Sequence, residues 1–266
     1  MKKGEIRELL KPIKDGFLTG KSNAYKRPEY KLRDLGTMLE DLSRIEMLDW
    51  YKYAFSREPL NGKFTDEQRR TWMEQSIECG QEYCRLICKK YSSNDPVSLA
   101  KSMGLKVSYP ALPEGGDRIL FAEYRMPNQI SIFMDAVRKA NRLLENPEVS
   151  EVMTGKLNIS KLLLAHELFH CVEDQYKKEI FTQNEKIRLW SIGPFHNDSL
   201  IIALSEIAAM AFAKEMTRIP YAPYLMDVLL VYGYSPMEAS GLYEEMMGYA
   251  GLEPCSSENK EEEVKR

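Results

Sequence analysis

The feature that most constrains this chain is the segment Leu162–Gln175, LLLAHELFHCVEDQ, which carries two of the three histidines, four residues apart. The apolar residues before them predict a buried helix, and residues i and i+4 of a helix lie on one face. Two buried imidazoles without partners would cost free energy. The chain must therefore fold so that His166 and His170 meet a common partner, unless they are ordinary core histidines, each with its own hydrogen bonds.

The pattern His166-Glu167-x-x-His170 has the spacing of a helical zinc-binding motif. Both imidazoles can reach one ion, while Glu167 projects at a neighbouring angle, from which it can act on a water molecule. Such a carboxylate accepts a proton as water attacks a carbonyl that zinc polarises. The pattern therefore predicts a Zn²⁺ site with Glu167 as the general base.

A third protein ligand is needed to hold a catalytic zinc ion. One known pattern requires a glycine and a histidine at positions that Glu173 and Tyr176 occupy here, so that pattern fails. Glu206 is the only charge in the otherwise apolar run Leu200–Ala213. Because an isolated buried charge is costly, Glu206 is predicted to be the third ligand. The alternative is that it pairs with an arginine or faces solvent at a helix edge.

Other polar side chains are candidates for supporting roles. Asp174 is predicted to accept a hydrogen bond from His170, with a plain surface charge as the alternative. His196, the remaining histidine, is a candidate donor to the oxyanion that develops during hydrolysis, and a place in a loop or beside a helix cap is its alternative. Tyr221 and Tyr224 are weaker candidates for the same role.

Composition excludes several classes of protein. The chain has 266 residues, 44% of them hydrophobic and 29% charged, which is typical of a globular protein. No apolar run is long enough to span a bilayer, and the first residues do not resemble a signal peptide. Five cysteines argue against a disulfide framework, and a net charge of -3 gives no reason to expect a nucleic-acid partner. We therefore expect a cytoplasmic protein with reduced thiols.

The turn-forming segment Ser92–Pro96, SSNDP, is the clearest break in the chain. It predicts an N-terminal helical region over 1–94, a second domain over 95–250 and a charged, disordered tail over 251–266. A chain that begins near Asp95 should then keep the zinc site. Hydrophobic periodicity predicts strands at Leu105–Pro110, Asp117–Arg125 and Asn128–Asp135, and helices at Leu35–Ser56, Asp66–Tyr91, Ala136–Leu144, Ser160–Lys177, Ser199–Arg218, Tyr221–Tyr232 and Pro236–Tyr249.

With these residues in view, Asp95–Pro220 resembles the ImmA/IrrE family of zinc metallopeptidases. Three blocks carry the resemblance: DPVSLAKSMGLKVSYP, AHELFHCVED and SEIAAMAFAKEMTRIP. The resemblance implies a thermolysin-like zincin fold in which His166, His170 and Glu206 bind zinc. It implies that Glu167 is the general base. Some members of this family cleave a partner repressor and so relieve transcriptional repression.

The sequence as a whole predicts an α+β protein: a mostly helical, zincin-like metallopeptidase core with a small three-stranded sheet. The expected function is that of a zinc-dependent intracellular peptidase of narrow specificity, whose protein or peptide substrate is a regulatory partner such as a transcriptional repressor. The substrate strand is expected to add to a sheet edge at Asn128–Asp135. The alternative is a non-catalytic regulator that acts through its N-terminal helices and has a structural zinc site, closed by a fourth protein ligand.

Overall fold

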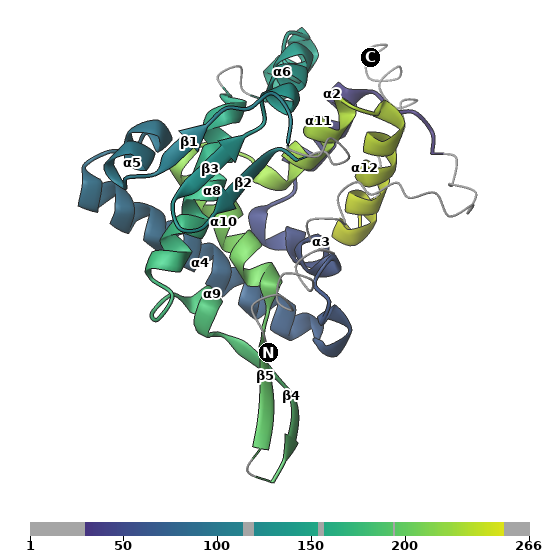
Figure 1. Ribbon diagram of the computed structural model, residues 1–266. Coiled ribbons are helices and arrows are strands. Elements are labelled where there is room, and N and C mark those ends of the chain that lie inside the picture. The colour runs from purple at the N-terminus through teal and green to yellow at the C-terminus, as the bar shows by residue number, and fades with distance from the viewer. Residues whose placement is uncertain (1–29, 114–119, 154–156, 194, 253–266) are drawn as a thin grey trace.

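The computed structural model describes residues 30–113, 120–153, 157–193 and 195–252. Over these ranges the chain is mainly helical, with one three-stranded sheet and one two-stranded hairpin (Figure 1). The predicted α+β class is confirmed. No helix in the described ranges combines the length and the apolar character that crossing a membrane requires.

The helices are α2 Leu35–Ser43, α3 Tyr51–Ser56, α4 Asp66–Tyr91, α5 Pro96–Ser102, α6 Met134–Leu143, α7 Pro147–Val152, α8 Ile159–Gln175, α9 Phe181–Asn184, α10 Ile202–Thr217, α11 Met226–Tyr232 and α12 Pro236–Ala250. Short 3₁₀ turns are η1 Met47–Trp50, η2 Asn61–Lys63 and η3 Pro223–Leu225. The strands are β1 Lys106–Ser108, β2 Ala122–Arg125, β3 Gln129–Ile132, β4 Lys186–Ile192 and β5 Phe195–Leu200.

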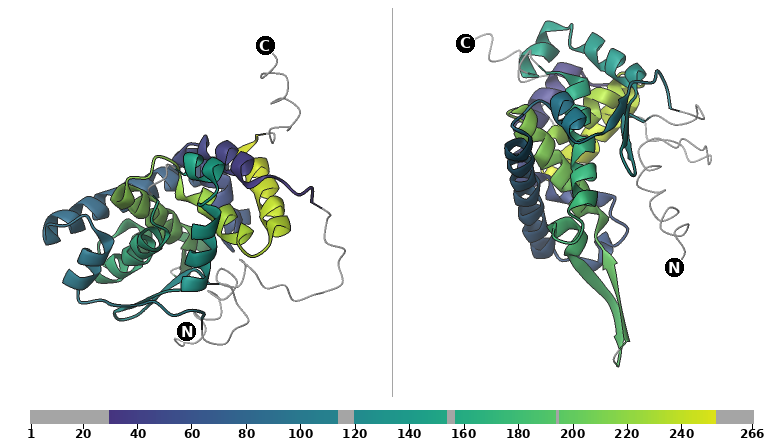
Figure 2. Two further views of the ribbon diagram at one scale, coloured as in Figure 1. Left: turned by 90° about the horizontal axis from the view of Figure 1, so that it is seen from above. Right: turned by 60° about the vertical axis from the view of Figure 1, so that its left-hand side comes forward.

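Three helices and the sheet are stacked in the order α4, α10, α8 and sheet (Figure 2). Helix α10 lies between α4 and α8, which explains why its residues are apolar on almost every side. The two helices approach closely at Gly80 of α4, where an added Cβ would lie 2.2 Å from the backbone oxygen of Ala208. The two helices can pack this closely only because position 80 has no side chain.

The three-stranded sheet has the order β1-β3-β2, with β3 parallel to β1 and antiparallel to β2. The expectation that Asn128–Asp135 forms a sheet edge is wrong, because β3 is hydrogen-bonded on both sides. The edges are β1 and β2, and β2 packs on α8. The predicted strand also ends early: Met134 and Asp135 already belong to α6.

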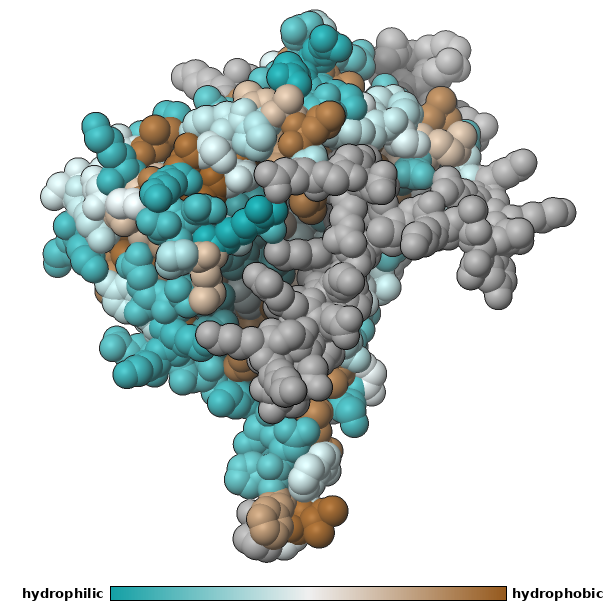
Figure 3. Space-filling model, viewed as in Figure 1, coloured by the Kyte–Doolittle hydropathy of each residue, from teal (hydrophilic) through white to brown (hydrophobic). Residues whose placement is uncertain are grey.

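A hairpin of β4 and β5 projects from the body of the molecule (Figure 1). It has no counterpart among the predicted elements, and its second strand includes Ser199, which was expected to begin a helix. Trp190, Ile192 and Phe195 are exposed near its tip, where apolar side chains gather (Figure 3). A shift in strand register between Arg188 and Trp190 interrupts the alternation that identifies a strand in the sequence.

The two regions predicted on either side of residue 94 share one hydrophobic core. Polar contacts also cross the expected boundary: Trp72 donates to Glu185 at 3.0 Å, and Tyr53 donates to Asp227 at 2.7 Å. The SSNDP segment does separate two helices, α4 and α5, but a division there cuts through the packed core. Residues 1–29 and most of the predicted tail lie outside the described residues.

Candidate metal centre

Helix α8 carries the histidine motif into the middle of the molecule. Its first turn is capped by Asn158, whose side chain accepts a hydrogen bond from the Lys161 N–H at 3.0 Å. The helix is buried both where it meets the sheet and where it meets α10. His166 and His170, one turn apart, contact Glu206 of α10.

The structure brings His166, His170 and Glu206 together. The Nε2 atoms of the two histidines are 3.4 Å apart. Glu206 places Oε2 at 3.3 Å from Nε2 of His166 and Oε1 at 3.7 Å from Nε2 of His170. In a tetrahedral site with metal–ligand distances of about 2.0–2.2 Å, neighbouring ligand atoms are about 3.3–3.6 Å apart. The group fits one metal ion in both its spacing and its donor atoms.

The group is partly open to solvent. The side chain of Glu206 is 45% exposed, whereas the side chains of His166 and His170 are 18% and 19% exposed. Among the described residues, three side chains make up the group. Three protein donors with access to solvent match an open metal site, since a structural site is closed by a fourth protein ligand.

Glu167 lies on the side of α8 that faces the sheet and is buried. The backbone N–H of Tyr124 in β2 lies near its carboxylate and acts to lower its pKa. Burial raises the pKa of the Glu167 carboxyl, and the neighbouring His170 and His166 offset this only in part. A carboxyl with a raised pKa holds a proton more readily than an ordinary carboxyl, which suits a group that accepts and releases one.

A hydrogen-bonded network orients His170 through Nδ1, the ring nitrogen that does not face Glu206. The Ser205 hydroxyl donates to Glu173 Oε2 at 2.8 Å and lies 3.3 Å from Nδ1 of His170. Because the hydroxyl proton is directed at Glu173, Ser205 can accept from Nδ1–H of His170, and the neutral imidazole that a metal requires would then present the Nε2 lone pair to it. Thr182 donates to the other oxygen of Glu173 at 2.5 Å.

The charges in this network act on both titrating groups. Burial lowers the pKa of His170, but the contacts with Glu173 and Glu206 outweigh it and raise that pKa to about 9. Burial raises the pKa of Glu173, but the adjacent charge of His170, together with hydrogen bonds from Thr182 and Ser205, brings it below its usual value. Glu173 therefore remains ionised beside His170.

Glu173, not Asp174, is the acidic neighbour of His170. The carboxylate of Glu173 lies 3.9 Å from Nδ1 of His170. Asp174 lies instead on the side of α8 that faces β2: burial raises the pKa of Tyr124 in that strand, and the charges of Cys171 and Asp174 add to the increase. The two acids are adjacent in sequence, and the position of α10 decides which of them meets the histidine.

The candidate oxyanion donors lie in different places. His196 is on β5 of the projecting hairpin, exposed, with its nearest carboxylate contact at Asp198, 3.4 Å away (Figure 1). The structure does not bring it to the metal group. Tyr221 donates to the backbone oxygen of Met153 at 3.4 Å. Tyr224 is buried, and its hydroxyl has no hydrogen-bond partner among the described residues.

Asp227 of α11 is a further acid beside the group that sequence reasoning did not select. Burial raises the pKa of its carboxyl, while Arg57, the hydrogen bond from Tyr53 and His166 act to lower it. The charges of His166 and Glu206 both act on this carboxyl. The signal that could have found it is the one that found Glu206, because Asp227 is an acid within an apolar run.

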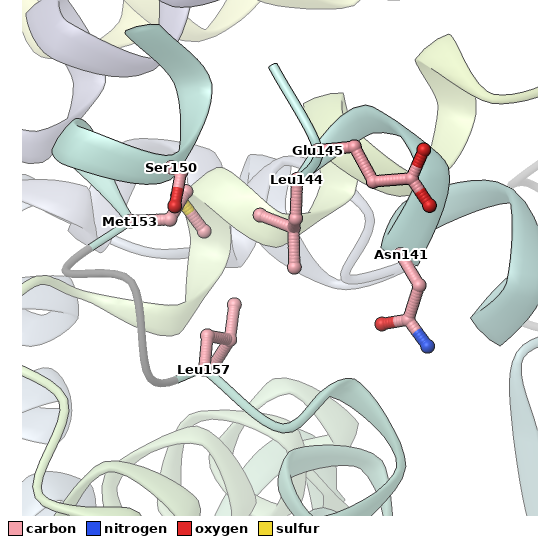
Figure 4. A pocket seen from close by; sticks show the side chains of 6 residues that line it. All are labelled: Asn141, Leu144, Glu145, Ser150, Met153 and Leu157. Atoms are coloured by element: carbon pink, nitrogen blue, oxygen red, sulfur yellow. The ribbon is translucent and has the colours of Figure 1, made fainter. Parts of the chain in front are cut away.

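The structure also has a small cavity elsewhere, of about 240 Å³, between α6, α7 and the residue 157 region (Figure 4). Its lining contains none of the residues of the metal group. It is formed by Asn141, Leu144, Glu145, Ser150, Met153 and Leu157.

Comparison with known proteins finds no match for this chain among protein-family models, curated proteins or solved structures. The resemblance to the ImmA/IrrE family therefore rests on the motif residues and their spacing. The geometry of the metal group is independent of that resemblance.

Proposed function

We propose that this protein is a zinc-dependent peptidase of narrow specificity that cleaves a regulatory protein partner in the cytoplasm. The observation that carries the proposal is the meeting of three metal donors, open to solvent on one side, with the buried carboxylate of Glu167 next to them in the chain. Two of the donors come from α8 and one from α10.

Each residue has a role that follows from its position. His166, His170 and Glu206 would hold the ion, and Ser205 and Glu173 fix the tautomer of His170. A zinc ion bound there would polarise a peptide carbonyl and acidify a water molecule. Glu167 would accept the proton from that water and pass it to the departing amine.

The edge strand β2 is the proposed binding site for the substrate backbone. It pairs with β3 on one side, and the N–H of Tyr124 in this strand lies near the carboxylate of Glu167. An extended peptide that adds to this edge would lie beside the general base. The proposal that the partner is a transcriptional repressor comes from the family resemblance alone.

Substitution of Glu167 tests the proposal. Glu167→Gln keeps the shape and hydrogen-bonding reach of the side chain but cannot accept the proton at neutral pH. We expect this variant to retain zinc, measured by elemental analysis, and to lose cleavage by a factor of about 10² or more. His166→Ala should instead lose the zinc itself.

The substrate for this test is found in extracts, by comparing new protein N-termini after addition of wild type or Glu167→Gln protein. Fragments produced by wild type alone would support the peptidase. If Glu167→Gln produces the same fragments or the same biological output, the hydrolytic mechanism fails, and the protein is a regulator with a structural zinc ion.

A further inference from the structure

Helix α10 begins without a cap of its own. Ile201 occupies the N-cap position, and its side chain cannot accept a hydrogen bond. The first turn of a helix has N–H groups without partners inside the helix, so a buried first turn needs an acceptor from elsewhere. This start is also the part of α10 that leads directly into Ser205 and Glu206, which contact the two histidines.

The acceptor is Glu58, which lies 145 residues away in the chain. Its Oε2 accepts a hydrogen bond from the Ala203 N–H at 3.0 Å, and its Oε1 accepts one from the Leu60 N–H at 3.1 Å. The residue is only 5% exposed. A buried carboxylate at this position satisfies a free N–H and interacts favourably with the positive end of the helix dipole.

A second contact joins the same segment of the chain to the surroundings of the metal group. Glu58 follows helix α3, and Tyr53 of α3 donates a hydrogen bond to Asp227 at 2.7 Å. Tyr53 also packs edge-on against Tyr224, with ring centroids 5.9 Å apart. The α3 segment thus contacts both α10 and the turn that leads into α11.

We propose that Glu58 is a positioning residue of the metal centre. It acts through the first turn of α10, which it fixes at Ala203, and so sets where Ser205 and Glu206 meet the histidines. The inference rests on the proposed metal site, and it adds that the N-terminal region helps to position that site. Without Glu58 the first turn of α10 would lose this hydrogen bond and become less ordered. The carboxylate of Glu206 and the hydroxyl of Ser205 would then shift relative to the histidines.

The test compares two substitutions that each remove a carboxylate from the start of a helix. Glu58→Ala removes the cap of α10. Asp34→Ala removes the cap of α2, where Asp34 accepts from the Thr37 N–H at 2.9 Å, and α2 carries no residue of the metal group. Both full-length variants are titrated with Zn²⁺ against a chelating dye, and the absorption spectrum of bound Co²⁺ reports the ligand geometry.

We expect Glu58→Ala to bind Zn²⁺ about tenfold more weakly than wild type, the low end of the loss seen when a group that orients a metal ligand is removed, and to change the Co²⁺ spectrum. Asp34→Ala should match wild type in both measurements, even though it too removes a carboxylate cap from a helix. Glu58→Gln, which keeps one acceptor oxygen, should show a smaller loss than alanine.

Equal affinity and an identical spectrum for Glu58→Ala and Asp34→Ala would overturn the role of Glu58. If Glu58→Ala does not fold, Glu58→Gln decides: a loss of about threefold or more relative to Asp34→Ala supports positioning, and no loss overturns it. Wild type that binds no Zn²⁺ would be a different result, because it would remove the proposed peptidase together with the inference.

Discussion

Ser205 of α10 lies 3.3 Å from Nδ1 of His170 of α8 and donates its own proton to Glu173. Ser205 directly precedes Glu206 in α10, and Glu206 also faces the His170 imidazole. The Ser205 hydroxyl thus links the position of α10 to that imidazole. The donor atoms from the two helices are held in place by this shared network as well as by the packing of the helices.

This network should determine metal affinity. We expect Ser205→Ala and Glu173→Gln each to weaken Zn²⁺ binding about 10- to 100-fold, because His170 then loses the partner that fixes its tautomer. The measurement is a competition titration with a chelator of known affinity. Asp174→Asn is the matched control, since it removes a charge from the same helix without touching His170, and it should bind as wild type. Equal affinities for Glu173→Gln and Asp174→Asn would contradict the network.

The close packing of α4 and α10 should make position 80 intolerant of a side chain. Gly80→Ala would press a Cβ against the backbone oxygen of Ala208, and such overpacking costs about 1–3 kcal/mol in the free energy of unfolding. Gly248→Ala is the control, because that site in α12 has open space and alanine favours a helix by about 1 kcal/mol. Urea denaturation of both variants measures the difference. If Gly80→Ala is as stable as wild type or more stable, α4 and α10 lie further apart than in this structure.

A chain that begins at Asp95 should not fold into a zinc-binding domain. Removing α4 exposes the apolar face of α10, and removing Glu58 takes away the cap of that helix. Circular dichroism and Zn²⁺ titration of the 95–252 fragment test this. We expect lost helicity and no stoichiometric binding. A folded fragment that binds zinc would restore the domain boundary that the sequence predicts at residue 94.

The sequence contains the information for the local part of the site. The i, i+4 spacing puts His166 and His170 on one face in any helix, and the apolar surroundings of Glu206 make its charge conspicuous. The local pattern does not tell which acid, Glu173 or Asp174, contacts His170, because both lie within about one turn of it in the helix. That choice depends on the side from which α10 approaches, which is a tertiary property.

The same limit applies to the sheet and to the boundary at residue 94. The local pattern predicts strands near Ala122–Arg125 and Gln129–Ile132. It does not predict that β3 is the central strand, because β3 becomes central by pairing with β1, which lies more than twenty residues earlier in the chain. SSNDP is correctly a turn between helices. Whether the helices before it form a separate domain depends on contacts such as Tyr53 to Asp227, which no local pattern contains.

The hairpin has a consequence for how the chain can vary. Its ends, Lys186 and Leu200, are paired across the two strands, so they are neighbours in space although the chain between them projects away. A shorter or longer hairpin would leave α9 and α10 joined at the same separation. Loop exchange, a fluorescent label or an affinity tag near Gly193 can therefore be introduced without changing the distance between the metal ligands.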